Sequence, residues 1–174
     1  ELANLGLPAI PAAVPGNVEL DMVRAGELPE PFFGMNTALL RPFEFHEWWY
    51  RREFASPDFA ASDLVFEGLD CYATVWLNGQ LLGTSANAMI AHRFDATAAL
   101  AVPGKANELV VRLCSPVNAV RDCPIGPSDR AQSCNLDSIW ARKPPHAYGW
   151  DIMPRVVSAG IWRPVRLEER RPTD

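Results

Sequence analysis

Prolines are spread along the whole sequence, and they constrain the fold more than any other feature. The chain has 16 prolines in 174 residues, which is roughly 9% against a usual background of about 5%. Because proline removes a backbone donor and breaks helix interiors, this frequency disfavours a helical bundle and favours short strands joined by rigid loops. The length suits a single domain, so we predict one all-β domain over residues 1–174.

Composition and charge exclude several classes of partner. Hydrophobic residues make up 48% of the chain and charged residues 21%, as in ordinary globular proteins. The net charge is −5 and the basic residues are scattered, so we expect no nucleic-acid partner. The longest apolar run, Ala96 to Val102, is far shorter than a membrane span requires, so we expect no membrane partner.

The N-terminus and the cysteines carry little chemistry. Glu1 is not an initiator methionine, and the first residues lack the regions of a signal peptide, so we expect a processed or excised chain. No two cysteines have CxxC spacing, and we expect neither a metal site nor a cofactor. Cys71 and Cys114 lie in strand-like runs and are predicted to be buried thiols, whereas Cys123 and Cys134 flank a loop and can pair.

Strand patterns dominate the middle of the chain. The clearest is Tyr72 to Leu77, where apolar and more polar residues alternate, followed by the Asn78-Gly79 pair of a type I′ turn. That turn predicts a hairpin with the next run as its return strand. The predicted strands are Glu47–Ala55, Asp63–Leu69, Tyr72–Leu77, Gln80–Thr84, Asn107–Cys114 and Ile161–Glu168.

One short helix and one long loop complete the predicted architecture. The helix runs from Val18 to Ala25, with Asn17 as its cap and Gly26 as its stop. Between Ser115 and Gly160 no periodic pattern persists, and a compact domain rarely keeps so long an irregular stretch unless it is functional. We therefore predict an antiparallel two-sheet sandwich with long loops at one end.

Trp150 and Asp151, within the long loop, are the main candidates for ligand binding. Prolines on both sides reduce the freedom of this segment, so its polar groups can be held ready for a ligand. An indole offers an apolar face to a sugar ring, and a neighbouring carboxylate accepts hydrogen bonds from hydroxyls. The alternative is structural: a buried Trp150, with Asp151 paired to Arg155 or Arg142.

A series of motifs in order along the chain resembles family 2 glycoside hydrolases of the β-mannosidase type. The series covers nearly the whole chain. It comprises Val14-Pro15-Gly16-Asn17-Val18 with Asp21 and Ala25-Gly26, Pro29-Glu30-Pro31-Phe32 with Gly34, Trp48-Trp49-Tyr50-Arg51-Arg52-Glu53-Phe54, Phe66-Glu67-Gly68-Leu69-Asp70, Tyr72-Ala73-Thr74-Val75-Trp76-Leu77-Asn78-Gly79, Asn107-Glu108-Leu109 with Ser115-Pro116, Arg142-Lys143, Gly149-Trp150-Asp151 with Pro154-Arg155, and Ser158-Ala159-Gly160-Ile161-Trp162-Arg163-Pro164-Val165.

The resemblance implies an N-terminal sugar-binding domain, a jelly-roll sandwich of the galactose-binding type. In that family, immunoglobulin-like domains and a catalytic TIM barrel follow, and we expect this chain to lack the barrel and to be inactive alone. The family's Trp-Asp pair helps hold the sugar of the glycone subsite, which implies that role for Trp150 and Asp151. The mannosidase motif continues with Trp-Gly, where this chain has Ile152-Met153.

The remaining candidates are secondary. His146 and Arg142 are the other loop residues that we consider for ligand contact, and no residue is assigned to catalysis. Four strand-like tryptophans are predicted to pack in the core or on the sheets: Trp48, Trp49, Trp76 and Trp162. Two other functions stay open, an autonomous carbohydrate-binding module and a purely structural sandwich.

Overall fold

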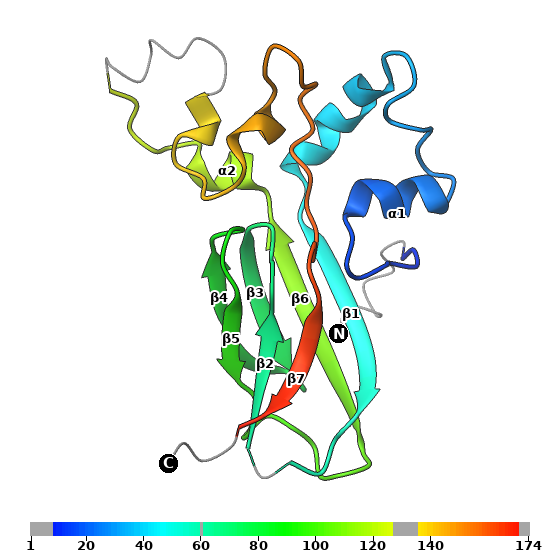
Figure 1. Cartoon of the computed structure of the whole chain (residues 1–174), viewed down its shortest axis with the longest axis vertical. Helices are drawn as coiled ribbons and strands as arrows, with labels where there is room; N and C mark the ends of the chain where they lie inside the picture. Colours follow the sequence, from blue (N-terminus) through cyan, green and yellow to red (C-terminus); the bar gives the residue numbers. More distant parts are fainter. Residues whose placement is uncertain (1–8, 60, 127–135, 171–174) are drawn as a thin grey trace.

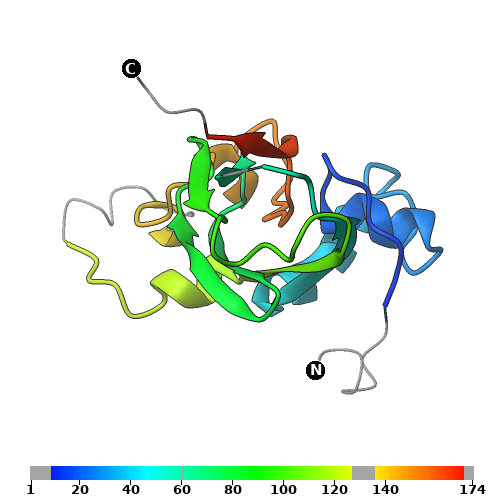
Figure 2. The ribbon, with the colours of Figure 1, turned by 90° about the horizontal axis from the view of Figure 1, so that it is seen from below.

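The computed structural model describes residues 9–59, 61–126 and 136–170, and these form two antiparallel sheets that face each other (Figures 1 and 2). One sheet has four strands in the order β1-β6-β3-β4, and the other has three in the order β5-β2-β7. The predicted all-β sandwich is confirmed. The strands are β1 (Trp48–Ala55), β2 (Ser62–Phe66), β3 (Tyr72–Leu77), β4 (Gln80–Ala86), β5 (His92–Asp95), β6 (Ala106–Cys114) and β7 (Val165–Glu169).

Local sequence signals account for the β3–β4 hairpin. Asn78 has a φ of 50° and Gly79 a φ of 79°, the left-handed values that a type I′ turn requires. Alternation along β3 and β6 then directs one side of each strand to the core. From the opposite sheet, Phe66 and Phe94 pack edge to face with ring centroids 6.0 Å apart. The inward residues of β3 and β6 are Ala73, Val75, Leu77, Leu109, Val111 and Leu113.

The predicted N-terminal helix is α1 (Val18–Arg24), and it lies beside the sandwich (Figure 1). The Asn17 side chain accepts a hydrogen bond from the Leu20 N–H at 3.0 Å, which satisfies one of the free donors at the helix start. The segment before α1 is held by backbone bonds to the chain near Gly160, from Gly16 N–H to the Ile161 carbonyl at 3.0 Å and from Val18 N–H to the Ala159 carbonyl at 2.9 Å.

Several boundaries differ from the sequence-based expectation. The last strand begins at Val165 rather than Ile161, because the backbone around Gly160 bonds to the entry of α1 and to Asp70 instead of to a strand. The expected loop Ser115–Gly160 contains short helical segments, and a ten-residue 3₁₀ helix precedes β1. These segments are α2 (Pro116–Val120), η2 (Asn36–Phe45), η4 (Leu136–Ser138) and η5 (Pro145–Tyr148).

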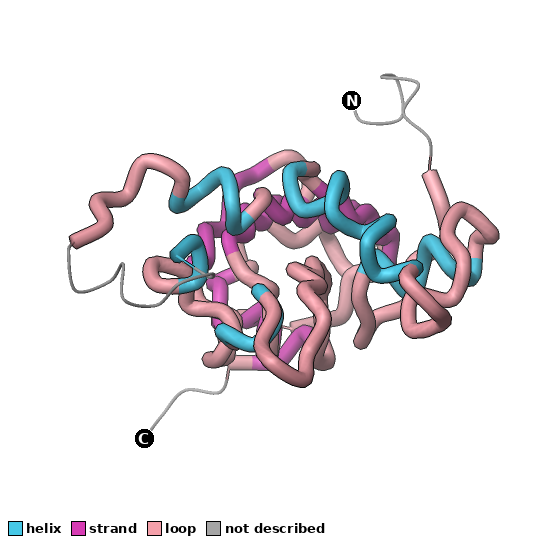
Figure 3. The backbone as a smooth tube through the Cα atoms, turned by 90° about the horizontal axis from the view of Figure 1, so that it is seen from above, coloured by secondary structure: helices cyan, strands magenta, loops and turns pink. Residues whose placement is uncertain are grey.

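The short helices and the long loop gather at one end of the sandwich (Figures 1 and 3). None of the helices in the described ranges has the length and apolar character needed to cross a bilayer. Cys71 is fully buried, as predicted, while Cys114 is half-buried. The suggested Cys123–Cys134 pair involves a residue outside the described part of the chain.

Candidate functional site

Trp150 and Asp151 lie at the tip of a tight hairpin-like turn. The N–H of Trp150 donates to the Met153 carbonyl at 2.9 Å, and the N–H of Met153 donates back to the Trp150 carbonyl at 3.1 Å. Asp151 and Ile152 therefore occupy the two central positions of the turn. Trp150 is 71% exposed and Ile152 is 89% exposed. The turn presents an indole and a carboxylate to the outside rather than burying them.

Arg155, two residues after this turn, links it to other segments of the chain and thereby braces it. Its guanidinium donates to the buried carboxylate of Glu44, with Nη2–Oε2 at 2.8 Å, and to Asp137, with Nη2–Oδ2 at 2.6 Å. It also lies over the ring of Tyr148, 5.3 Å from the centroid. Burial would lower the pKa of Arg155, but the hydrogen bonds to Asp137 and Glu44 outweigh it and raise that pKa. The brace therefore stays charged and joins the turn to η2 and η4.

Lys143 anchors the other end of the same segment. Its side chain is 1% exposed, and the ammonium donates to the Asp70 carboxylate and, at 2.7 Å, to the Ser158 carbonyl. Burial raises the pKa of Asp70, while the charge of Lys143 and its hydrogen bond oppose that rise. The segment from 143 to 155 is thus attached to Asp70 at one end and to η2 and η4 at the other.

The structure does not contain the alternative arrangement, in which Asp151 pairs with Arg155 or Arg142 and Trp150 is buried. Arg155 is taken up by Glu44 and Asp137, and within the described ranges Asp151 makes no ion pair with Arg155 or Arg142. Trp150 is not buried either. Asp151 is therefore an exposed carboxylate on a braced turn, with its acceptor atoms available.

The two secondary candidates lie near this turn in sequence but are not joined to it by side-chain bonds. His146 is exposed in η5, and its carbonyl accepts from the Gly149 N–H at 3.0 Å. The Arg142 side chain is exposed, and its carbonyl accepts from the Ala88 N–H at 2.8 Å. Over the residues that the structure covers, no group of three or more His, Cys, Asp or Glu side chains is placed to hold a metal ion.

Sequence reasoning missed the residues that hold the turn in place. Glu44 is 111 residues from Arg155, and no local pattern connects them. It also missed a pocket of about 460 Å³ beside Arg155, with Phe45 and Trp140 among its lining residues. None of the four predicted ligand-contact residues lines this pocket. The predicted pair therefore lies on an exposed turn, apart from this pocket.

Comparison with known proteins gives a consistent family assignment. The family described as "Glycosyl hydrolase 2 galactose-binding domain-like" matches residues 2–163. A β-mannosidase B from Thermothelomyces thermophilus is 36% identical over 162 residues, covering 88% of this chain and 18% of the relative. A β-mannosidase B from Emericella nidulans is 35% identical over 171 residues, covering 95% of this chain and 20% of the relative.

Solved structures agree with this assignment. A β-D-mannosidase from Dictyoglomus thermophilum superposes with a TM-score of 0.80 at 33% identity, covering 91% of this chain and 20% of the other. An exo-chitosanase from Amycolatopsis orientalis superposes with a TM-score of 0.53 at 25% identity, covering 64% of this chain and 14% of the other. The chain thus spans about a fifth of the length of the curated relatives that it matches.

Proposed function

Because the chain belongs to the glycosyl hydrolase 2 galactose-binding domain-like family, we propose that it is the non-catalytic, N-terminal sugar-binding domain of a larger β-mannosidase-like enzyme. Its similarity to β-mannosidases along most of its length supports this proposal. The enzyme would be a retaining exo-β-glycosidase. Its carboxyl pair, about 5–5.5 Å apart in such enzymes, belongs to the catalytic barrel, a domain that follows this one.

The observation that carries the proposal is the exposed, braced turn with Trp150 and Asp151 at its tip. A carboxylate that pairs with no arginine within the described residues keeps its acceptor atoms for another partner. The neighbouring indole, 71% exposed, supplies an apolar face for the C–H side of a sugar ring. In the proposed enzyme this turn reaches into the barrel and contributes to the glycone subsite.

Attachment at both ends favours sugar binding by the turn, because it lowers the conformational entropy that binding would cost. A turn already fixed by Lys143 and Arg155 loses little conformational entropy when it meets a sugar. Contacts made by Asp151 then contribute to binding rather than to ordering the loop. His146 and Arg142 are secondary candidates for contact with the same ligand, since both are exposed in the adjoining segment.

Asp151→Asn in the enzyme that contains this chain tests the proposal. The variant keeps the shape of the side chain but loses the charge of its hydrogen bonds, which contribute about 1.5–3 kcal/mol each when one partner is charged. We expect kcat/KM for an aryl β-mannoside to fall about 10- to 150-fold. Asp151→Ala removes both acceptors and is expected to cost more.

The control is Asp58→Asn, which changes an exposed carboxylate in the loop between β1 and β2 and should leave kcat/KM unchanged. The melting temperature of the isolated domain should stay the same for both variants. Full activity of Asp151→Asn would refute the contact with substrate. The isolated chain should hydrolyse no aryl β-glycoside, and turnover lost on mutating one of its own carboxylates would refute the non-catalytic assignment.

The identity of the sugar is a separate part of the proposal. Relatives in this comparison include β-mannosidases and an exo-chitosanase, so similar domains occur in enzymes named for different sugars. Ile152, at the tip beside Asp151, is 89% exposed and makes this part of the turn apolar. Measuring kcat/KM with an aryl β-mannoside, β-glucoside and β-glucosaminide decides which of these sugars the enzyme accepts best. We expect the mannoside to be preferred.

A further inference from the structure

Two tryptophans stack on the outer face of the four-stranded sheet, far in sequence from the candidate turn. Trp49 of β1 and Trp76 of β3 have ring centroids 5.7 Å apart and planes inclined by 14°. Their neighbours Trp48 and Val75 pack toward the core, so alternation directs Trp49 and Trp76 outward. Trp49 remains 41% exposed. The prediction that both pack in the core or on the sheets is confirmed in its second form, because the stack lies on the outer surface of the sheet.

Arg112 of β6 lies between the two strands that carry the indoles. It is directly opposite Trp49 on one side and Thr74 on the other. Its guanidinium carbon is 5.8 Å from the centre of the Trp49 ring and 6.0 Å from that of Trp76. Among the described residues no carboxylate is within ion-pair distance of Arg112. Its Nη2 donates to Thr74 Oγ1 at 3.4 Å, and its Nε is buried without a partner. This half-buried arginine is held by the two indole rings and by Thr74, and it can offer a ligand only its guanidinium Nη groups.

Carboxylates flank the aromatic surface on the next row of the sheet. Arg51, whose Cα pairs with that of Val110 next to Trp76, binds Glu53 at 2.6 Å and Glu108 at 2.5 Å. Successive outward residues on a strand are about 7 Å apart, and neighbouring strands are about 4.8 Å apart. The exposed indole, the arginine side chains and the carboxylates therefore lie on adjacent rows of the same sheet face.

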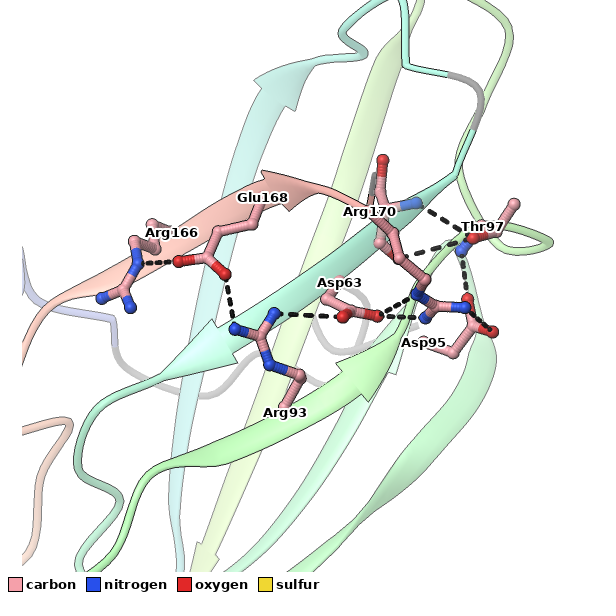
Figure 4. Close-up of polar contacts among 8 residues, drawn as sticks. Asp63, Arg93, Asp95, Thr97, Arg166, Glu168 and Arg170 are labelled. Atoms are coloured by element: carbon pink, nitrogen blue, oxygen red, sulfur yellow. Dashed lines mark hydrogen bonds and ion pairs between the residues drawn. The ribbon is translucent and has the colours of Figure 1, made fainter. Parts of the chain in front are cut away.

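The outer face of the other sheet is built differently (Figure 4). There Asp63 lies between two arginines, 3.0 Å from Arg93 and also bonded to Arg170, and Glu168 bridges Arg93 and Arg166. The charges of that cluster are satisfied by one another. Both faces thus carry charges that are paired with one another, and what distinguishes the Trp49–Trp76 face is its partly exposed aromatic stack.

We propose that the outer face of the β1-β6-β3-β4 sheet is a second carbohydrate-binding site, one that takes a segment of a β-linked oligosaccharide. A pyranose ring lies against the exposed indole surface of Trp49, and its hydroxyls bond to Arg112 and to the carboxylates held by Arg51. A sugar chain needs an apolar surface with donors and acceptors at its edge, which this face supplies. A stable protein partner would instead need roughly 1,200–2,000 Å² of contact with a largely apolar centre.

This site does not depend on the candidate turn. Its residues come from β1, β3 and β6, and Asp151 takes no part in it. It would hold a polymeric substrate near the enzyme while the turn contacts the terminal sugar. The two proposals therefore fail separately, one in kinetics of the whole enzyme and the other in oligosaccharide binding by this chain.

Binding of β-1,4-mannohexaose to this chain, followed by calorimetry and by tryptophan fluorescence, tests the site. We expect a Kd below 1 mM, weakened at least tenfold by Trp49→Ala and several-fold by Arg112→Met. Trp49→Phe keeps an aromatic face and should retain much of the affinity. The control is Arg166→Ala on the opposite sheet, which should bind as the parent does, and Trp150→Ala measures any contribution from the candidate turn.

Circular dichroism melting of each variant establishes that the fold is intact before binding is compared. Loss of mannohexaose binding in Trp150→Ala but not in Trp49→Ala would overturn the proposal and assign all binding to the turn. Absence of binding by the folded parent chain at 10 mM ligand, roughly ten times the expected upper Kd, would also overturn it. A Trp49-dependent dimer in analytical ultracentrifugation, without sugar binding, would identify the face as a protein contact instead.

Discussion

Nη2 of Arg155 lies 2.8 Å from Oε2 of Glu44, a residue 111 positions earlier in the chain. The Glu44 side chain is 2% exposed and that of Arg155 is 17% exposed, so the pair is largely shielded from water. This ion pair attaches the loop that carries Trp150 and Asp151 to η2, so the turn's own backbone hydrogen bonds are not the only contacts that position it. The position of the candidate site therefore depends on an ion pair that is remote in sequence.

Replacing Arg155 by Met should destabilise the domain strongly, because it leaves the carboxylate of Glu44 buried without its main cation. Removing one partner of a buried ion pair costs about 3–5 kcal/mol, and we expect a loss near the lower end in urea denaturation. The control is Arg166→Met, since Arg166 pairs with Glu67 and Glu168 at the surface, and such pairs contribute less than about 1 kcal/mol. Equal effects of the two variants would contradict this account.

Lys143→Met should likewise lower the free energy of unfolding by about 3–5 kcal/mol, since it leaves the Asp70 carboxylate buried and unpaired. Adding Asp70→Asn to the same protein should recover part of that loss by removing the stranded charge. The measurement is a double-mutant cycle by chemical denaturation. If the two losses simply add, Lys143 and Asp70 do not stabilise one another, and the anchor of the loop must lie elsewhere.

Glu19 should make stability depend on pH in a predictable direction. Burial raises the pKa of this carboxyl from 4.5 to about 7, against hydrogen bonds from the backbone N–H groups of Glu19 and Ala159 and the charge of Lys143. Between those two values the folded chain binds a proton that the unfolded chain has released, so the stability contributed by this group falls as the pH rises from about 4.5 to about 7.

Glu19→Gln should remove this dependence. Relative to the variant, the parent should lose about 3 kcal/mol of unfolding free energy between pH 4.5 and pH 8. Urea denaturation of both proteins across that range gives the difference, in which the titration of other groups largely cancels. A difference that stays constant with pH would show that Glu19 keeps an ordinary pKa in the folded protein.

Gly160→Ala should disturb the docking of α1. A Cβ added at Gly160 would lie 2.4 Å from the Gly16 carbonyl oxygen and 2.7 Å from the Asn17 Cα, and both of these are backbone atoms that cannot rotate away. Overpacking of this kind costs about 1–3 kcal/mol. Gly104→Ala is the control, because it adds a Cβ in open space and tests only the cost of a φ of +77°. A harmless Gly160→Ala would mean that the α1 entry segment is loosely attached.

Elements with local causes were predictable from the sequence. Asn78-Gly79 predicts its turn locally, because such residues readily take the positive φ angles required at both central positions. Asn17 caps α1 through a neighbour three residues away, and alternation in β3 directs Val75 and Leu77 inward. The motif series also pointed to the correct family. Short elements with weaker patterns, β5 and η2, were not foreseen.

The sequence by itself determined the all-β class, the central hairpin and the capped helix, and it pointed to Trp150 and Asp151 as candidates, because each of these rests on residues close together in the chain. Only the tertiary structure decided what holds that pair in place and which tryptophans remain at the surface. Arg155 can meet any of several carboxylates, and pairing with Glu44 rather than Asp151 follows from how η2 packs against the loop. Likewise, the registers of β1 and of β3 against β6 bring Trp49, Arg112 and Trp76 together, since contacts across a sheet depend on strand pairing that no local pattern specifies.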